Sequence, residues 1–471
     1  DIQFGFYSSW SHKLAKVEKI AKTGDGSIIQ MSQPGFYLCN RAGGAVAKMP
    51  SYMENALELL DEPGEWYFDR PARALYYLPR PEEDMTKAEV IAPRLETIML
   101  VKGAHDIRFE GLTFAHATWL LPSSALAHPD VQANCIQPVD NSYFRPEHEK
   151  GWVPVNGEHL KSVANVEVSS CRGIMFDGCT FTAMGGAGLD FDGAVQSNTV
   201  VGCVFSDISA SAIQVGGISR QDHHPDSPDR VVKNNKVINN FITHIGAEYT
   251  DAIGIFVGYT EGTIVAHNEI YDVPYSGVSI GWGWGMPDAG GGVYVCPVIH
   301  KTPTTAKNNR IEYNHIHKMM QERNDGAGVY TLSRQPGTVI RRNHIHDGGK
   351  SGLSGGVYLD EGSADIEVSA NVIYGMPRPL MFNNHNQNRR ASCPIRDNHL
   401  APPPSEAPGK KGLALRSGSG VDTALDIDPA RFTVTAWIRL DKHPQGADAR
   451  RWIVCREAHE FTDRNVSLFV D

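Results

Sequence analysis

The residues with the clearest chemical potential are acidic side chains near two related segments of the chain. Asp325 stands three residues before Gly328. Asp360 and Glu361 close the apolar segment that corresponds to the one after Gly328. Hydrolysis of a glycosidic bond uses two carboxyl groups, one protonated and one ionised. We therefore name Asp325, Asp360 and Glu361 as candidate catalytic residues.

The spacing of the two aspartates sets a geometric condition. Aligning the two segments places Asp325 opposite Leu353 and not opposite Asp360. Residues along a straight strand are about 3.3 Å apart, so the carboxyl groups can meet across one sugar only if the chain bends between them. The ordinary role of a single aspartate at a turn is a hydrogen bond to its own backbone. That alternative is stronger for Asp325 than for Asp360, which follows an apolar segment.

Aromatic and polar residues near the acids could hold a sugar, because aromatic rings combine an apolar face with polar edges. Trp282 and Trp284 alternate with glycines, which predicts a flexible loop with exposed indoles, although core packing is the alternative. The other candidate substrate-binding residues are Tyr275, Tyr330, Tyr358, His317, His346, Asp251 and His385. The two histidines could equally be solvated strand residues.

Metal and cofactor sites are not expected. His223-His224-Pro225-Asp226 has metal-ligand residue types, but the spacing is too short to close a site unaided. The eight cysteines form no CxxC pair, so we interpret them as small core residues and not as a zinc ribbon or a disulfide framework.

Composition excludes several classes of protein. The 471 residues include 44 Lys and Arg against 54 Asp and Glu, a net charge of −10, which argues against a nucleic-acid partner. No run of about 18 apolar residues predicts a membrane span. Asp1 is not an initiator Met, so we expect upstream sequence with a signal and an extracellular or periplasmic protein. The expected partner is a carbohydrate polymer or oligosaccharide, and the oligomeric state stays open.

A repeat organises the region that carries these residues. Asn314-His315-Ile316-His317 recurs as Asn343-His344-Ile345-His346, a period of 29 residues. Related triplets begin at Asn240, Asn268 and Asn371. Units of this size with short strands predict an all-β fold, a right-handed parallel β-helix in which the five asparagines stack in one column. A β-sandwich of hairpins ranks second, because the Asp-Gly pairs occur at the coil period and not at hairpin spacing.

Longer gaps in the repeat predict loops that build a binding face. They fall at about Trp119–Lys161, Ser219–Arg230 and Gly281–Lys307. Before the repeat, the apolar spacing of Leu14, Val17 and Ile20 predicts a helix. Tyr52–Leu60 could be a second short helix.

The strands expected at Phe432–Leu440 and Trp452–Val454 resemble the start of a laminin-G-like (concanavalin-like) jelly-roll domain. That segment is shorter than such a domain, so we interpret it as a truncated piece. The expected domains are an N-terminal β-rich cap with a hairpin at 1–104, the catalytic β-helix at 105–400, a Pro-rich linker at 401–411 and the partial laminin-G-like domain at 412–471.

Several motifs between about Asp61 and Asn398 resemble one group of enzymes. They are Pro63–Asp69, Leu75–Pro79, Phe109–His116, Tyr275–Gly285 and Tyr358–Ser363. These motifs are similar to right-handed β-helix glycoside hydrolases, and in particular to glycoside hydrolase family 141. The resemblance implies a secreted glycosidase acting on plant-type or other complex polysaccharides, α-L-fucosidase or xylanase-like. It also implies two catalytic aspartates, which fall by motif on Asp325 and Asp360.

Two other functions remain open on the same fold. A polysaccharide lyase would use a Lys or Arg base, for which Lys318 and Arg323 are nearby, and commonly Ca²⁺ to handle an anionic uronate. The acidic charge of the chain mildly disfavours such a polyanion. A non-catalytic glycan-binding solenoid is the third possibility.

Overall fold

The computed structural model describes residues 2–41, 49–137, 159–291, 299–383, 387–401, 451–455 and 467–470. The chain divides into two compact units, Asp1–Pro403 and Pro404–Asp471. In the second unit the described part is an antiparallel pair, β35 (Arg451–Cys455) and β36 (Ser467–Val470). The linker at 401–411 and the partial laminin-G-like domain at 412–471 otherwise lie outside the described residues, so both stay predictions.

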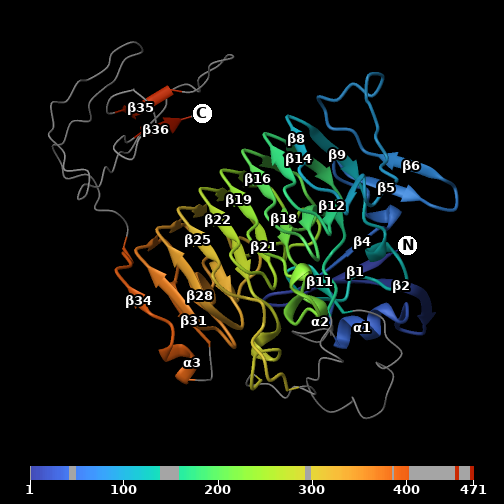
Figure 1. The fold of residues 1–471 in the computed structure, drawn as a ribbon. Helices are drawn as coiled ribbons and strands as arrows, with labels where there is room; N and C mark the ends of the chain where they lie inside the picture. Colours follow the sequence, from blue (N-terminus) through green and yellow to red (C-terminus); the bar gives the residue numbers. More distant parts are fainter. Residues whose placement is uncertain are drawn as a thin grey trace, which may run out of the picture. The chain divides into compact units, whose positions relative to one another are not determined.

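The first unit is a solenoid of three parallel sheets. Its strands follow one another in colour order, from blue-green to orange, along the stack (Figure 1). Each coil contributes one strand to each sheet, and every strand pairs in parallel with the strands of the coils before and after it. The predicted parallel β-helix is therefore confirmed.

The first sheet, which carries the candidate site, contains β7 (Met99–Lys102), β12 (Ala164–Ser169), β15 (Ala187–Phe191), β18 (Ile213–Val215), β21 (Ile255–Val257), β24 (Val278–Ile280), β27 (Gly326–Thr331), β30 (Ser354–Leu359) and β33 (Arg378–Phe382). The second sheet contains β8 (Arg108–Glu110), β13 (Met175–Asp177), β16 (Thr199–Val201), β19 (Lys236–Ile238), β22 (Ile264–Ala266), β25 (Arg310–Glu312), β28 (Arg334–Arg341), β31 (Ala364–Ser369) and β34 (Ile395–Arg396). The third sheet contains β9 (Thr113–Ala117), β14 (Thr180–Met184), β17 (Val204–Phe205), β20 (Phe241–Thr243), β23 (Glu269–Tyr271), β26 (His315–His317), β29 (His344–His346) and β32 (Val372–Tyr374). The first sheet thus begins with β7, a few residues before the predicted start of the β-helix at residue 105.

The asparagine column forms as predicted, at the turn between the second and third sheets. Each side-chain amide donates to the side-chain oxygen of the next asparagine, at 2.9 Å from Asn240 to Asn268 and 3.0 Å from Asn314 to Asn343. The column continues beyond Asn371 to Asn398. The isoleucines two residues after five of these asparagines point into the core with no exposed surface: Ile242, Ile270, Ile316, Ile345 and Ile373. Hydrogen-bonded turns and an aliphatic interior together explain why the Asn-x-Ile pattern builds coils.

The N-terminal region is a small antiparallel sheet at the blue end of the stack (Figure 1). Its strands are β1 (Gln3–Tyr7), β2 (His12–Thr23), β3 (Gly26–Met31) and β4 (Tyr52–Glu54), in the order β3-β2-β1-β4, with helix α1 (Gly35–Arg41) beside them. A separate hairpin follows, made of β5 (Trp66–Asp69) and β6 (Ala74–Tyr77), as predicted.

Both helices predicted in this region are wrong. Leu14, Val17 and Ile20 lie in β2, which pairs with β1 on one side and β3 on the other. Their spacing misleads because the first half of β2 is buried on both faces, so apolar residues need not alternate. Tyr52–Leu60 contains β4 and a single 3₁₀ turn at Leu57–Leu59.

A second small hairpin and one short helix belong to the loops that the longer gaps predict. The hairpin is β10 (Asp130–Gln132) with β11 (Cys135–Ile136), and the helix is α2 (Arg220–His223). A further short helix, α3 (Gln387–Ala391), lies between β33 and β34, outside the predicted loops. Six described cysteines are free and buried, in agreement with their interpretation as core residues: Cys39, Cys135, Cys171, Cys179, Cys203 and Cys393.

Candidate active site

Asp325 and Asp360 lie on neighbouring coils of the first sheet. Asp325 immediately precedes β27, and Asp360 immediately follows β30. The backbone N–H of Asp325 donates to the carbonyl of Leu353 at 2.8 Å, which is the register that the sequence indicates. Asp325 has a left-handed φ of 60°, so the chain turns at this residue before entering the strand. The two aspartates therefore occupy opposite ends of two paired strands.

Two tyrosines connect the aspartates across the strands. Tyr330 and Tyr358 are partners in the register of β27 and β30, and their rings meet edge to face at 5.3 Å. The Tyr330 hydroxyl donates to the carboxyl group of Asp360, and the Tyr358 hydroxyl donates to that of Asp325 at 3.2 Å. Each tyrosine thus bonds the aspartate of the other coil. Both rings are 2 % exposed, so they orient the acids more than they offer an open stacking face.

Tyr275 and Gln132 add a further hydrogen-bonded link. Gln132 of β10 donates to the Tyr275 hydroxyl at 2.9 Å, and that hydroxyl donates to the backbone carbonyl of Asp325 at 2.9 Å. Gln132 belongs to the insertion at Trp119–Lys161. This insertion therefore reaches the acids, in line with the prediction that the long loops build the binding face. Tyr275 has no exposed surface, and burial together with the nearby charges of Asp325 and Asp360 raises its hydroxyl pKa well above the usual value.

The two carboxyl groups differ in their surroundings. Asp360 is 7 % exposed, and burial raises its pKa to about 6. Hydrogen bonds from Tyr330 and Asn383 oppose this shift, whereas the charge of Asp325 adds to it. Burial also raises the pKa of Asp325, which is half-buried, while the hydrogen bond from Tyr358 lowers it. Asp360 is therefore the better proton donor near neutral pH.

Glu361 acts on Asp360 through its main chain. Its backbone N–H donates to the Asp360 carboxylate and favours the ionised form. The Glu361 side chain is 1 % exposed, and its backbone carbonyl accepts the N–H of Ser333 at 3.2 Å. Glu361 is thus placed as a positioning residue for Asp360, and its own carboxylate is closed off from solvent.

The raised pKa of Asp360 predicts a pH-dependent stability. An aspartate in an unfolded chain has a pKa near 3.9, below the folded value of about 6. The folded protein therefore binds this proton more tightly, and the resulting stabilisation is complete below about pH 4 and lost as the pH rises through about 6. Asp360→Asn removes the ionisable carboxyl group, so its effect on the free energy of unfolding should differ between the two pH values. We expect this effect to be more stabilising at about pH 8 than at about pH 4, by up to roughly 3 kcal/mol. Chemical denaturation at both pH values measures this difference, and an equal effect at both would contradict the raised pKa.

The tryptophan loop differs from its prediction. Trp282 and Trp284 are 2 % and 7 % exposed, so the expected exposed indoles are wrong. The two rings lie 5.1 Å apart, and the ring of His159 meets both edge to face at 5.7 and 6.2 Å. Trp282 also packs against Phe256 of β21. Gly283, between the two tryptophans, and Gly285, after them, belong to a compact 3₁₀ turn at Gly283–Gly285 and not to a mobile loop.

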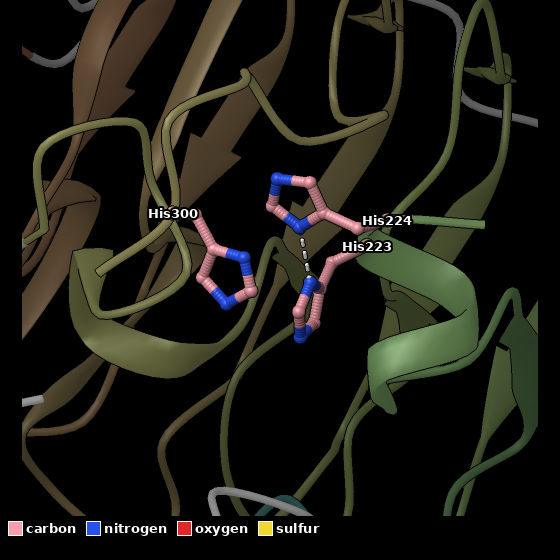
Figure 2. A group of neighbouring side chains, drawn as sticks. All are labelled: His223, His224 and His300. Atoms are coloured by element: carbon pink, nitrogen blue, oxygen red, sulfur yellow. Dashed lines mark hydrogen bonds between the residues drawn. The ribbon is translucent and has the colours of Figure 1, made fainter. Parts of the chain in front are cut away.

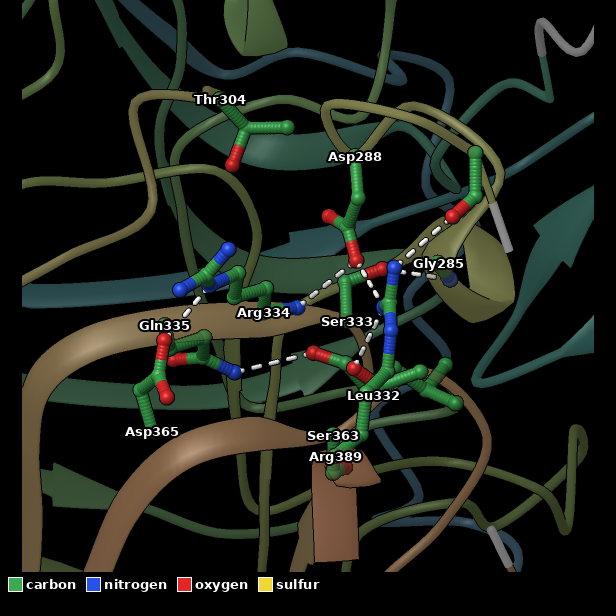
Figure 3. Close-up of polar contacts among 12 residues, drawn as sticks. Gly285, Asp288, Thr304, Leu332, Ser333, Arg334, Gln335, Ser363, Asp365 and Arg389 are labelled. Atoms are coloured by element: carbon green, nitrogen blue, oxygen red, sulfur yellow. Dashed lines mark hydrogen bonds and ion pairs between the residues drawn. The ribbon is translucent and has the colours of Figure 1, made fainter. Parts of the chain in front are cut away.

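Polar contacts fasten this loop to the ends of β27 and β30 (Figure 3). The Ser333 hydroxyl donates to the Trp282 carbonyl at 2.6 Å and accepts the N–H of Gly285 at 2.7 Å. Asp288, on the same loop, forms an ion pair with Arg389 of α3. Arg389 in turn donates to the carbonyl of Gly362 at 2.9 Å.

Gly362, two residues after Asp360, permits the close approach of the loop. A Cβ at Gly362 would lie 2.6 Å from the Gly285 backbone, and Gly362 has a φ of 79°. Only glycine fits both the conformation and the contact. The tryptophan loop is therefore built against the turn that carries Asp360 and Glu361.

The structure does not bring the predicted histidines to the acids. His317 and His346 lie on β26 and β29 of the third sheet, whereas Asp325 and Asp360 flank strands of the first sheet. The error arises because a coil of three strands turns the chain between the NHIH motif and the following acidic segment. His385 lies outside the described residues, although Asn383, two residues earlier, donates to Asp360 at 3.0 Å.

Asp251 is not available to a substrate, because it has no exposed surface. Its carboxylate accepts the backbone N–H and the side-chain amide of Asn134, both at 2.7 Å. It also shares a hydrogen bond with Asp130, and burial with this neighbouring charge raises the pKa of Asp130 well above its usual value. Asp251 therefore holds the insertion at Trp119–Lys161 onto the solenoid and does not contact sugar.

Sequence reasoning named Tyr330 and Tyr358 but missed the other members of a row of residues on the outer face of the first sheet. The parallel register places these side chains side by side: Asp190, Gln214, Phe256, Ser279, Tyr330 and Tyr358. Near this row, Gln214 Oε1, His159 Nδ1 and Trp282 Nε1 are buried and find no hydrogen-bond partner among the described residues. Side chains alternate between the inner and outer face along each strand, and the members of the row occupy the same outward position in successive coils. This alternation was the signal in the sequence that could have identified the row.

Two loops meet at a cluster of three histidines, His223, His224 and His300 (Figure 2). His223 Nδ1 lies 2.6 Å from His224 Nδ1, and His224 Nε2 lies 2.8 Å from the carbonyl oxygen of Thr302. The predicted loop at Ser219–Arg230 thus joins the one at Gly281–Lys307. Burial and the neighbouring histidines lower the pKa of His223 to about 3, so it is neutral near pH 7.

Comparison with known families accounts for this architecture. Residues 2–80 match the model of the GH141 insertion domain, and residues 163–373 match that of the right-handed β-helix region. The resemblance to right-handed β-helix glycoside hydrolases is thereby confirmed. Among the described residues, no helix combines the length and apolarity needed to cross a bilayer.

A solved structure described as a glycoside hydrolase is similar to most of the chain. The alignment has 29 % sequence identity and a TM-score of 0.69, and covers 86 % of this chain and 68 % of that one. An alginate lyase from Paenibacillus aligns with 11 % identity and a TM-score of 0.33 over 51 % of this chain and 76 % of its own. The adhesin PfbA of Streptococcus pneumoniae aligns with 12 % identity and a TM-score of 0.34 over 52 % of this chain and 70 % of its own. A search of curated proteins found no significant match.

Proposed function

We propose that this chain is a secreted glycoside hydrolase, extracellular or periplasmic, that cleaves a glycosidic bond in a plant-type or other complex polysaccharide. An α-L-fucosidase or xylanase-like activity is the most specific form of this proposal. Its main support is the pair of acids on adjacent coils, each held by a tyrosine of the other coil. Such a constellation places two carboxyl groups in fixed and different environments, which acid–base hydrolysis of a glycoside needs.

The roles follow from the surroundings of each acid. Asp360 is the more buried and holds its proton up to about pH 6, so it protonates the leaving-group oxygen as general acid. Asp325 is half-buried, and the hydrogen bond from Tyr358 favours its ionised form. Asp325 then acts as the nucleophile or as the base that activates water. The backbone N–H of Glu361 and the Asn383 amide orient Asp360.

Carbohydrate as the substrate class is supported by the similarity to glycoside hydrolases and by the two carboxyl groups that flank β27 and β30. The row on the outer face of the first sheet adds no open sugar-binding surface, because Gln214, Phe256 and the neighbouring Trp282 are each at most 2 % exposed.

The bases considered for a lyase are not placed to serve these acids. The Arg323 guanidinium stacks over the Tyr7 ring at 3.8 Å and donates to the Ser8 carbonyl at 3.2 Å. The Lys318 ammonium lies 3.2 Å from the hydroxyl of Tyr271 on the third sheet. The structure therefore favours a hydrolase with carboxyl catalysts over a lyase with either of these bases.

The experiment is a glycan panel assayed with the parent protein and with the double variant Asp325→Asn, Asp360→Asn. We expect the parent to release reducing sugar from a neutral fucosylated or xylan-type polymer and the double variant to release none. Uronate polymers report the competing activity through the ultraviolet absorbance of an unsaturated product. Glycan binding by both proteins without turnover by either would instead favour a non-catalytic solenoid.

A further inference from the structure

The four histidines of the two Asn-His-Ile-His copies form a compact array on the outer face of the third sheet. The register of β26 and β29 pairs His315 with His344 and His317 with His346. Their rings lie close together, at 4.2 Å between His315 and His317 and 5.1 Å between His317 and His346. The intervening isoleucines point inward, so all four imidazoles lie on one surface. The proposed hydrolysis makes no use of this array.

Two imidazoles of the array face each other, and a carboxylate lies behind one of them. His315 Nε2 lies 2.8 Å from His346 Nε2. His346 Nδ1 lies 2.9 Å from an oxygen of Asp347, and a proton on Nδ1 for that hydrogen bond leaves the lone pair of His346 on Nε2, toward His315. Glu269 is hydrogen-bonded to His317 Nε2 at 3.1 Å and lies 3.7 Å from His315 Nδ1. Without a metal, His315 Nε2–H can donate to His346 Nε2, and a cation would take the place of that proton.

His344 supplies a third nitrogen. The ligand atoms of His315, His344 and His346 all lie within 4.8 Å of one another. Zn²⁺ binds imidazole nitrogen at about 2.0–2.1 Å. Imidazole donors suit Zn²⁺ and its neighbours in the transition series.

We propose that the histidine array binds a divalent transition-metal ion such as Zn²⁺, with His315, His344 and His346 as ligands. Asp347 holds the His346 ring through Nδ1, and Glu269 binds His317 beside the three ligands. The ion joins two adjacent coils, because His315 belongs to one and His344 and His346 belong to the next. These are the coils that continue into β27 and β30, which carry Asp325 and Asp360.

The loop cluster of His223, His224 and His300 is a poorer site for a cation. Stacked rings do not separate the two clusters, because His224 and His300 stack at 4.2 Å and 13° and His315 and His344 stack at 5.0 Å and 8°. Burial, the neighbouring histidines and the positive charge of Arg220 lower the pKa values of His223 and His300, and that charge would also repel a metal ion. The loop cluster therefore provides a matched control for the array.

The test is a Zn²⁺ titration of chelator-treated protein without an affinity tag, against a chromophoric chelator. We expect His346→Ala and His346→Gln to weaken the tightest-bound ion by about 100-fold or more, and Asp347→Asn to weaken it by about 10–100-fold. His300→Ala should leave the affinity unchanged. Saturating Zn²⁺ should also raise the Tm of the parent and of His300→Ala but not that of His346→Ala.

Circular dichroism of the metal-free variants shows whether they are folded, and the surface variant Asp347→Asn tests the site without removing a ligand. Loss of Zn²⁺ binding in His300→Ala with full binding in both His346 variants would overturn the proposal. Binding by the parent no tighter than by His346→Gln would overturn it as well. Because the titration needs no glycan, its outcome is independent of the proposed hydrolysis.

Discussion

Asp360→Asn is expected to lower kcat on a natural glycan by about 10³-fold or more, because general acid catalysis typically contributes about 10²–10⁴-fold. The loss should shrink strongly on an aryl glycoside whose leaving group departs without protonation. Asp325→Asn should instead lose activity on both substrates, because a nucleophile or base is needed whatever the leaving group. Comparing the two variants on the two substrates therefore assigns the two roles.

Both replacements keep the hydrogen-bond acceptor of Tyr330 or Tyr358, so glycan binding and folding should persist. Asp272→Asn serves as the control, since this partly exposed aspartate lies at the end of a third-sheet strand. Near-parent activity of Asp360→Asn on the natural glycan would contradict the acid role. Equal losses for both variants on both substrates would contradict the division of roles between the aspartates.

Asn314→Leu is expected to lower the free energy of unfolding by about 3–5 kcal/mol, because it breaks the middle of the asparagine column. The Asn314 side chain donates to the carbonyl of Val265 and to Asn343, and it accepts two bonds from Asn268. Leucine would leave these buried polar groups without partners, and each such group costs about 1–3 kcal/mol.

The measurement is chemical denaturation of the first unit, with circular dichroism as the probe of unfolding. Lys236→Ala is the matched control, because this exposed residue lies on an outer strand surface of the same solenoid. A destabilisation by Asn314→Leu no larger than that of Lys236→Ala would show that the column is not a main source of stability.

Much of the solenoid could be predicted because its signals are local. Each asparagine is followed two residues later by a core isoleucine, so the turn and the interior strand position are encoded together. The same repeat fixed the register that places Tyr330 beside Tyr358 and Asp325 beside Leu353. The laminin-G-like assignment of 412–471 stays a prediction.

The site was harder to predict because contacts between coils and loops complete it. The burial of Trp282 and Trp284 depends on Ser333, His159 and Gly362, all distant in sequence. Likewise, Gln132 reaches Tyr275 from an insertion 143 residues away. Local composition around the tryptophans suggested a flexible loop, and only the tertiary contacts reverse that interpretation.

The histidines show the opposite error. Their proximity in sequence to the acids suggested a shared site, but the chain passes from the third sheet to the first between His317 and Asp325. In a solenoid, residues one coil apart are neighbours in space, whereas residues eight positions apart can lie on different faces. His317 therefore stacks on His346, about one coil away, and not on the acids.

The most direct test of the proposed hydrolysis is turnover in water labelled with a heavy oxygen isotope, followed by mass spectrometry of the products. Hydrolysis through Asp325 and Asp360 predicts one labelled oxygen at the newly formed reducing end of each cleaved bond, and no product from the double variant. Cleaved glycan without incorporated label would show elimination in place of hydrolysis. Labelled product formed at the parent rate by the double variant would show that other residues perform the reaction.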